Sequence, residues 1–323
     1  MYKYILKRLV LAIPTVIGAA AIVFFLSRLI PGDVCEVRLL DMGMNADLGL
    51  IELCRDNLGL NDPVLVQFAR FLKGLVTFDL GNSHWTGNPV EAEIKLRFAL
   101  SLQLAIMATM VSVVIAVPLG IIAAVKQDTW IDYVVRTISI AGVAMPSFWV
   151  GILLVLGLLI FSQAWFGEPW MPPIEYVSVF EDPVANLSQL IWPAIAVGYR
   201  YAAVTARMTR SALLDVIRED YVRTARSKGL SEFVVINRHA LMNAFFPVLT
   251  VIGAELAFLM GGLVVTEQVF NLNGLARLLL ESVLNQDYEM TQALVMVVVT
   301  VFVFVNLVVD LLYAWLDPRI RYS

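Results

Sequence analysis

Long apolar stretches separated by short polar segments are the dominant pattern along the chain. Six of them are long enough to cross a membrane as helices, because the hydrocarbon core of a bilayer requires about 20 apolar residues. They are residues 9–30, 99–125, 136–161, 189–209, 246–268 and 289–315. The pattern predicts an all-α integral membrane protein with six transmembrane helices.

The first apolar stretch also has a feature of a secretory signal, since Lys3, Lys7 and Arg8 precede it. It is longer, however, than the apolar core of a signal peptide, and residues 29–33 contain no small-residue cleavage pattern. We therefore expect residues 1–30 to stay in the protein as a cytoplasmic N-terminal segment and a membrane anchor.

The distribution of Lys and Arg predicts the orientation of the helices, because short cytoplasmic loops retain positive charge. Basic residues gather before the first stretch, after the second, between the fourth and fifth, and in the C-terminal tail. By contrast, residues 162–188 contain none and residues 269–288 contain only Arg277. Both termini are therefore expected in the cytoplasm, and the long segment 31–98 on the outer side.

The exported segment 31–98 is the only large polar piece. Asn61-Asp62-Pro63 is typical of a helix start, and the apolar positions after it recur at helical spacing. We expect short helices on the outer membrane face. They form either a packing cap over the membrane helices or a docking surface for an extracytoplasmic partner.

Both cysteines, Cys35 and Cys54, lie in the exported segment. An oxidising compartment would permit a disulfide between them, worth roughly 3 kcal/mol by chain-entropy reasoning; two free thiols are the alternative. Two Cys and two His, His84 and His239, are too far apart in sequence to predict a metal site.

Composition supports the membrane class. The chain is 59% hydrophobic and 15% charged, whereas soluble domains have roughly 45–50% apolar and about 25% charged residues. The formal charge of −4 does not suggest a nucleic-acid partner. The sequence has no G-x-x-x-x-G-K-[ST] phosphate loop, no zinc spacing and no nucleophile motif. It therefore predicts neither an enzyme nor a resident cofactor.

The cytoplasmic segment between the fourth and fifth stretches is the most informative one. A basic loop there could serve only to set orientation. Ala225 and Gly229, however, are small residues four positions apart, and such a pair lets another backbone approach a short helix closely.

This segment resembles the coupling loop of ABC importer permeases, specifically of the dipeptide, oligopeptide and nickel class. The resemblance covers nearly the whole chain. The segments that carry it are 4–8, 13–15, 30–33, 58–63, 79–81, 146–149, 208–211, 220–230, 238–244, 267–270, 274–277, 287–288, 306–310 and 317–321. Where the general importer signature reads Glu-Ala-Ala, this chain has Arg223-Thr224-Ala225, a variation that the peptide class shares.

The resemblance implies a permease subunit in a bacterial inner membrane, surrounded by lipid. Its partners would be a second homologous permease, two cytoplasmic ATPases and an extracytoplasmic substrate-binding protein. Residues 99–323 would be a five-helix core, with a cytoplasmic coupling loop at 210–245. Within that loop, Ala225 and Gly229 would touch the ATPase, with Arg223, Arg226 and Lys228 flanking. Glu219 and Asp220 would cap the coupling helix.

Polar residues inside the predicted spans are candidates for the translocation pathway, because a lone charge there is unfavourable by roughly 2.5–3.5 kcal/mol. Arg200 and Glu255 are expected to face one cavity, either bridging each other or contacting cargo. Helical rotation places Gly262 and Thr266 on the face of Glu255. Pro146 and Ser147 are candidates for a moving gate.

These features together predict a subunit of an ATP-driven importer of di- or oligopeptides. Nickel chelates, glutathione and oligosaccharides stay open as alternative cargo. A self-sufficient secondary transporter should show two related halves, and no such repeat is visible in the sequence.

Overall fold

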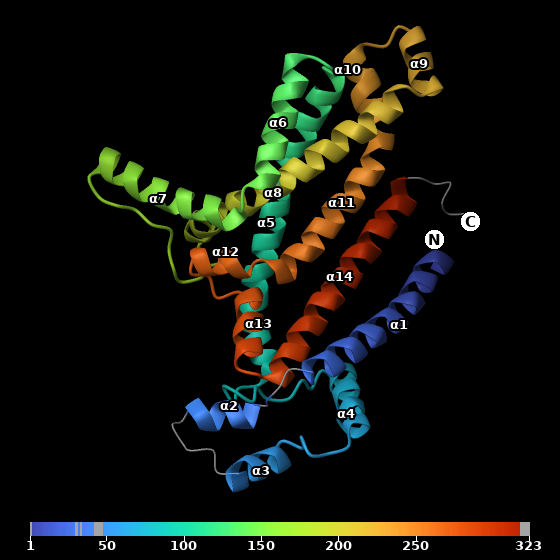
Figure 1. The fold of residues 1–323 in the computed structure, drawn as a ribbon. Helices are drawn as coiled ribbons and strands as arrows, with labels where there is room; N and C mark the ends of the chain where they lie inside the picture. Colours follow the sequence, from blue (N-terminus) through green and yellow to red (C-terminus); the bar gives the residue numbers. More distant parts are fainter. Residues whose placement is uncertain (1, 30–31, 33, 42–47, 317–323) are drawn as a thin grey trace. The chain divides into compact units, whose positions relative to one another are not determined.

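The computed structural model describes residues 2–29, 32, 34–41 and 48–316, and the regular structure of these residues is helical (Figure 1). The first helices are α1 (Tyr2–Ser27), α2 (Val34–Asp41), α3 (Leu48–Asn57), α4 (Val64–Thr77) and α5 (Val90–Val125). They are followed by α6 (Trp130–Ala144), α7 (Ser147–Phe166), α8 (Pro183–Ile217), α9 (Asp220–Ser227) and α10 (Glu232–Val234). The π-helix η1 (Val235–Ala240) then leads into α11 (Leu241–Gly262), α12 (Val264–Val269), α13 (Leu275–Leu284) and α14 (Tyr288–Leu316).

Within the part of the chain that the structure describes, five helical segments are long and apolar enough to cross a membrane, as expected of a multi-pass membrane protein. They are Leu6–Ser27, Val90–Val125, Ser147–Phe166, Glu232–Gly262 and Tyr288–Ala314. The predicted stretch 189–209 lies inside α8, which is not among the five. Polar residues such as Arg200 lower the hydropathy of that helix.

The single span predicted at 136–161 is wrong, because the helix breaks between α6 and α7. Met145 has φ −84° and ψ 125°, and Pro146 has φ −64° and ψ 136°, so both are extended. Proline has no N–H and disfavours the α conformation of the residue before it. The Tyr199 hydroxyl donates a hydrogen bond of 2.6 Å to the Met145 carbonyl, which holds the break against α8.

The described residues form two compact units. One holds residues up to 101 together with 260–264 and 273–307, and the other holds 102–259, 265–272 and the stretch from 308 onward.

In the first unit α4 packs against the end of α1. The ring of Phe24 lies 5.0 Å from that of Phe68 and 5.8 Å from that of Phe71. Cys35 and Cys54 join α2 to α3 in a disulfide, the pairing that the sequence predicts, with Cα atoms 5.9 Å apart.

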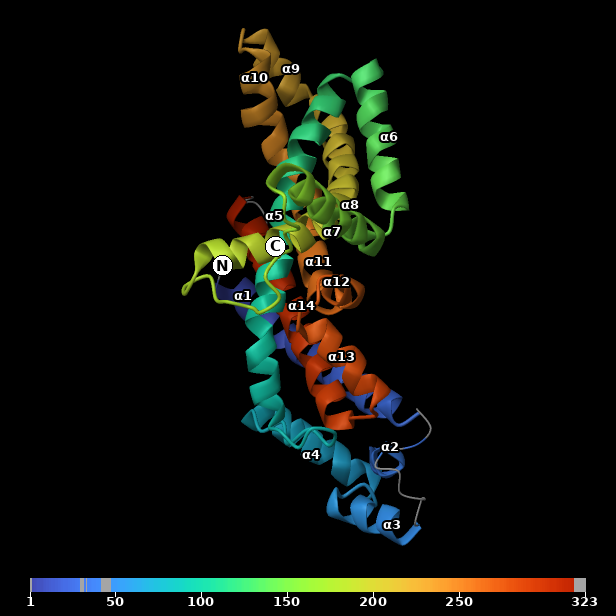
Figure 2. The ribbon, with the colours of Figure 1, turned by 90° about the vertical axis from the view of Figure 1, so that its left-hand side faces the viewer.

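In the second unit α8 is the central helix, and α6 lies beside it (Figures 1 and 2). Two glycines bring α5 and α8 together. A Cβ on Gly198 would lie 2.7 Å from the Ala108 carbonyl oxygen, and one on Gly120 would lie 2.6 Å from the Thr209 Cβ. Small residues at helix interfaces permit this close packing inside membranes.

A buried ion pair fixes α6 to α8. The guanidinium of Arg210 binds Asp132 in a bidentate manner, with Nε–Oδ1 and Nη2–Oδ2 distances of 2.7 Å. Asp132 is fully buried and also accepts a bond of 3.1 Å from the Asp128 backbone N–H. The hydrogen bond from Arg210 lowers the pKa of Asp132 despite burial, so the carboxylate stays charged.

The glycine packing predicts that Gly198→Ala destabilises the protein by about 1–3 kcal/mol, because the added methyl group overlaps the backbone of α5. Gly157→Ala on α7 is the matched control. Nothing lies within 4 Å of a Cβ at Gly157, and alanine favours a helix over glycine. Thermal unfolding of the detergent-purified chain measures both. Equal melting temperatures for the two variants would contradict the packing.

The ion pair predicts a dependence of stability on pH. The pKa of Asp132 is lower in the folded state, so its contribution is full above the unfolded pKa of about 3.9 and is lost as pH falls through the folded pKa. Asp132→Asn should lower stability at neutral pH by about 3 kcal/mol and flatten the acid limb of a melting-temperature profile. The exposed Asp215→Asn on α8 is the control and should leave that limb unchanged.

Candidate functional site

The amphipathic helix α9 lies in a seat formed by its own chain. Val222 and Ala225, three positions apart, share one face of the helix, and their exposed fractions are 0% and 6%. They join a buried cluster contributed by the ends of α5 and α8, by η1 and by the start of α11. Its other buried members are Ala124, Ala212, Leu213, Val235, Ile236, Ala240, Ala244 and Val248.

Ala225 is only 6% exposed because it packs within its own chain, and its predicted contact with an ATPase stays a prediction. An eight-residue helix is stable only when its apolar side is buried, and Val222 and Ala225 form that side. The small side chain of Ala225 permits a close approach, but to other helices of the same chain.

Gly229 ends the helix and stays exposed. Its φ of 78° is in the left-handed region that favours glycine, and its N–H donates a bond of 2.9 Å to the Arg226 carbonyl. No atom lies within 4 Å of a Cβ placed on it. Its contact with an ATPase therefore stays a prediction, but its backbone conformation already accounts for a glycine here.

Two side-chain contacts hold α9 to the following helices. Arg226 binds Glu232 with Nη2–Oε1 and Nε–Oε2 distances of 2.7 and 3.1 Å, which closes the turn between α9 and α10. The Asn243 amide donates a bond of 2.7 Å to the Tyr221 hydroxyl, which links α9 to α11. Arg226 is thus paired within the chain, and its predicted contact with an ATPase stays a prediction.

The predicted capping residues lie at the start of α9. Glu219 occupies the N-cap position, but its side chain makes no capping hydrogen bond. Asp220 forms an exposed ion pair of 3.6 Å with Arg223. Both carboxylates lie where negative charge is favourable near a helix N-terminus.

The outward side of this region is a mixed aromatic, apolar and cationic surface, which we term the coupling face. It consists of Tyr221, Arg223, Lys228, Gly229, Leu230 and Phe233, all exposed. Phe233 has an exposed fraction of 76%. Aromatic and arginine side chains are the residues that most often dominate binding energy at interfaces. The sequence pattern did not single out Tyr221, Leu230 and Phe233. Helical rotation from the buried Val222 could have indicated only Tyr221, because Leu230 and Phe233 lie beyond the end of α9.

The two charged candidates in the membrane do not bridge each other. Glu255 is 7% exposed, and the Thr205 hydroxyl lies 3.0 Å from each of its carboxylate oxygens. Arg200 is exposed, and the described residues show no ion pair between it and Glu255. Thr205 and Glu255 instead tie α8 to α11, and cargo contact by Arg200 or Glu255 stays a prediction.

The predicted common face of Glu255, Gly262 and Thr266 requires one continuous helix, and the structure contradicts this. The helix α11 ends at Gly262, and Thr266 lies in the separate helix α12. The adjacent glycines 261 and 262 weaken a helix at this point. Pro146 and Ser147 lie at the break between α6 and α7, and their part in a gate stays a prediction.

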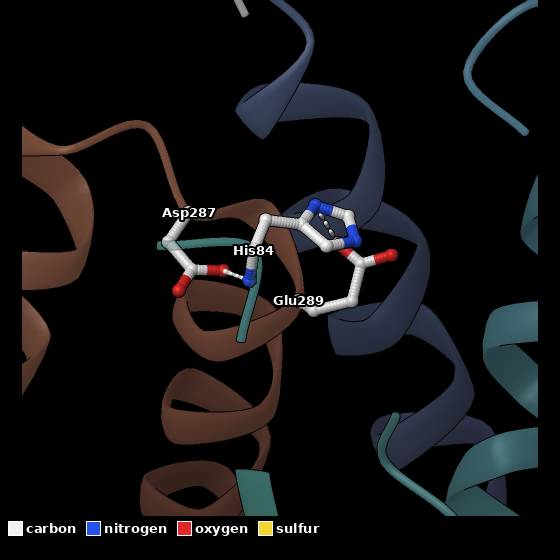
Figure 3. Close-up of side chains that lie close together, drawn as sticks. All are labelled: His84, Asp287 and Glu289. Atoms are coloured by element: carbon white, nitrogen blue, oxygen red, sulfur yellow. Dashed lines mark hydrogen bonds and ion pairs between the residues drawn. The ribbon is translucent and has the colours of Figure 1, made fainter. Parts of the chain in front are cut away.

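A second polar cluster lies in the first unit, where residues 83–85 meet the start of α14 (Figure 3). The imidazole Nδ1 of His84 is 3.2 Å from Glu289 Oε2. The backbone N–H of the same histidine donates a bond of 3.2 Å to Asp287 Oδ1. Possible ligand atoms of these three side chains lie within 4.8 Å of one another, a spacing compatible with a metal ion.

The hydrogen bonds of Asp287 favour an anchoring role for this cluster. Besides the His84 N–H, its carboxylate accepts bonds from the Ser83 hydroxyl, the Trp85 N–H at 3.4 Å and the Met290 N–H at 3.3 Å. A carboxylate offers about four lone-pair sites, and these four donors fill them. Asp287 therefore fastens the 83–85 loop to the first turn of α14.

Comparison with known proteins identifies the family. Residues 116–322 match the family described as binding-protein-dependent transport system inner membrane component, and residues 1–105 match its N-terminal counterpart. The chain belongs to this family. It is therefore a permease subunit of an ABC importer.

Relatives of this permease match it over their full length. It is 39% identical to the dipeptide transport system permease protein DppB of Alkalihalophilus pseudofirmus, with 100% of both chains covered. It is 41% identical to the glutathione transport system permease protein GsiC of Salmonella paratyphi A, again with 100% of both chains covered.

The packing of α9 in the buried cluster predicts that Ala225→Leu displaces the helix. About three extra carbon atoms would overpack the cluster and lower the stability of this packing by roughly 1–3 kcal/mol. Trypsin should then cleave faster after Arg223 and Lys228 in inside-out membrane vesicles. Ser227→Leu, on the exposed side of the same helix, is the control and should keep the original rate. Equal cleavage rates for both variants would contradict the packing of Ala225 in the buried cluster.

Proposed function

We propose that this permease forms half of the translocation pathway of a peptide importer, and that residues 219–238 receive the motion of a separate ATPase. The observation that carries the proposal is the packing of α9, with its apolar side in the chain and the coupling face outside. Family membership supports the same role, because an importer permease works with an ATPase. The absence of a phosphate loop from the sequence agrees with a motor on another chain.

The proposed topology has six spans, with both termini and the coupling face in the cytoplasm and residues 31–98 exported. The positive-inside distribution supports it. The candidate span Glu232–Gly262 has 31 residues, which exceeds the about 20 needed to cross a bilayer. Its first turns, including Phe233, can therefore lie outside the membrane.

The proposed mechanism transmits force through packed contacts. An ATPase that closes would move α9, and the buried Val222 and Ala225 would carry α8 and the start of α11 with it. Because Thr205 and Glu255 join these two helices deeper in the membrane, they would tilt together. Such a tilt would switch the pathway between outward and inward openings.

The proposed assembly contains this permease, a second homologous permease, two ATPases and an extracytoplasmic binding protein, in a bacterial inner membrane. Small peptides are the proposed cargo. Two relatives support this class. One is named for the transport of dipeptides and the other for the transport of glutathione, and glutathione is itself a tripeptide. Glutathione is the second candidate for the cargo, because one relative is named for its transport.

The coupling face predicts that Phe233→Ala weakens ATPase binding by about 2 kcal/mol, the effect of truncating an interface aromatic residue. The measurement is co-purification of the ATPase and uptake of a labelled dipeptide by the reconstituted importer. Phe180→Ala is the matched control, because Phe180 is 95% exposed in the loop between α7 and α8. Normal ATPase recovery and uptake with Phe233→Ala would overturn the proposal.

A further inference from the structure

A cavity of about 280 Å³ lies in the first unit among the end of α1, the helix α4 and the start of α14. The candidate spans in α1 and α14 end at Ser27 and begin at Tyr288. The cavity is therefore at the level where apolar helix gives way to polar residues. In a bilayer this level is the headgroup region.

Arg28, in the wall of this cavity, is a half-buried cation with neutral hydrogen-bond acceptors. Its guanidinium donates to the Phe24 carbonyl at 3.0 Å and to the side-chain oxygen of Gln67. Its Cζ lies 3.5 Å from the centroid of the Phe24 ring. Burial lowers the pKa of Arg28, and the negative charge of Glu289 opposes this shift. A bound anion would compensate the buried charge more directly.

Contacts with neighbouring side chains account for some of the other charged residues in the wall. Arg70 binds Asp62 at 2.5 Å, and Glu289 lies 3.2 Å from His84. Lys73 and Asp79 also line the cavity, and the described residues show no ion pair for either. The cavity therefore presents two cations, Arg28 and Lys73, and one separate carboxylate, Asp79.

Part of the remaining wall is apolar, beside the polar residues Thr77, Tyr288 and Gln292. Phe71 and Leu75 line the cavity. Ile22, Phe25 and Leu26, just before Arg28 on α1, are exposed. An amphiphile with its polar end in the cavity could lay hydrocarbon chains along this side of α1, because exposed apolar surface in a bilayer is covered by lipid.

We propose that this cavity binds the headgroup of a zwitterionic phospholipid of the phosphatidylethanolamine type. Its phosphate contacts Arg28 and Lys73, and its ammonium contacts Asp79. Its acyl chains follow the exposed side of α1. The lipid thereby joins α1, α4 and α14 at the membrane surface. The assignment rests on charge complementarity and adds a lipid site to the proposed transport function.

The test is native mass spectrometry of the delipidated full chain in detergent, titrated with dioleoyl phosphatidylethanolamine. Arg28→Gln and Lys73→Gln should each weaken binding about fivefold, the contribution of one cation near a lipid surface. Lys73 is exposed, so its variant keeps the test valid if Arg28→Gln unfolds. Lys95→Gln, which removes an exposed cation of the same unit outside the cavity, should bind like the parent chain.

Two further titrations separate the sources of the phosphate and test the ammonium contact. Glycerophosphoethanolamine without acyl chains should compete poorly, and Asp79→Asn should bind dioleoyl phosphatidylglycerol better than the parent chain does. Unchanged lipid binding in both cation variants, or competition by the free headgroup as strong as by the lipid, would overturn the proposal. Equal binding of the two lipids by the parent chain would also overturn it. None of these readouts depends on transport, so failure here is distinct from failure of the proposed function.

Discussion

The burial of Val222 and Ala225 holds α9 in the permease, and the proposed function depends on this contact. A helix of eight residues has little stability of its own in water, so its position is set by what its apolar side touches. Here that side meets the ends of α5 and α8 and the start of α11. A force on the outward side of α9 therefore reaches three long helices without crossing a flexible linker.

Other contacts make the second unit a connected set of helices. The bidentate pair of Asp132 and Arg210 fixes α6 to α8. Gly120 on α5 and Gly198 on α8 have no side chain, so the two helices can pack closely at both positions. Thr205 and Glu255 add a polar contact between α8 and α11 within the membrane. Each contact involves α8, which makes this helix the centre through which motion of α9 would spread.

Sequence patterns predict most of the helical architecture, because apolar length and charge distribution depend on the bilayer and not on tertiary detail. The helix break at Met145-Pro146 divides a stretch that the apolar pattern predicts as one span, because a proline in such a stretch can either kink the helix or break it. The break after Gly262 separated Thr266 from Glu255 and removed a face that helical rotation had predicted. Such breaks depend on neighbouring helices, which a single sequence does not place.

The sequence predicts the segment of the candidate site but not which of its side chains are buried in the chain and which are exposed. The small size of Ala225 predicts a close contact, yet size alone does not say whether the contact is with a partner or with the same chain. The pairing of Arg226 with Glu232 could not be predicted from spacing alone. It depends on the turn between α9 and α10, in which Gly229 adopts a left-handed conformation. The approach of residues 83–85 to Asp287 joins segments about 200 positions apart, which single-sequence periodicity cannot reveal.

The central claim is that α9 and the start of α11 move as one body while the ATPase cycles. The most direct measurement is to replace Tyr221 and Asn243, which are hydrogen-bonded across this contact, by cysteines and join them with a short bifunctional thiol reagent in the reconstituted importer. The account predicts that the cross-linked importer still takes up dipeptide at the rate of the uncross-linked protein. Loss of ATP-driven uptake on cross-linking, restored when the link is cleaved, would contradict it.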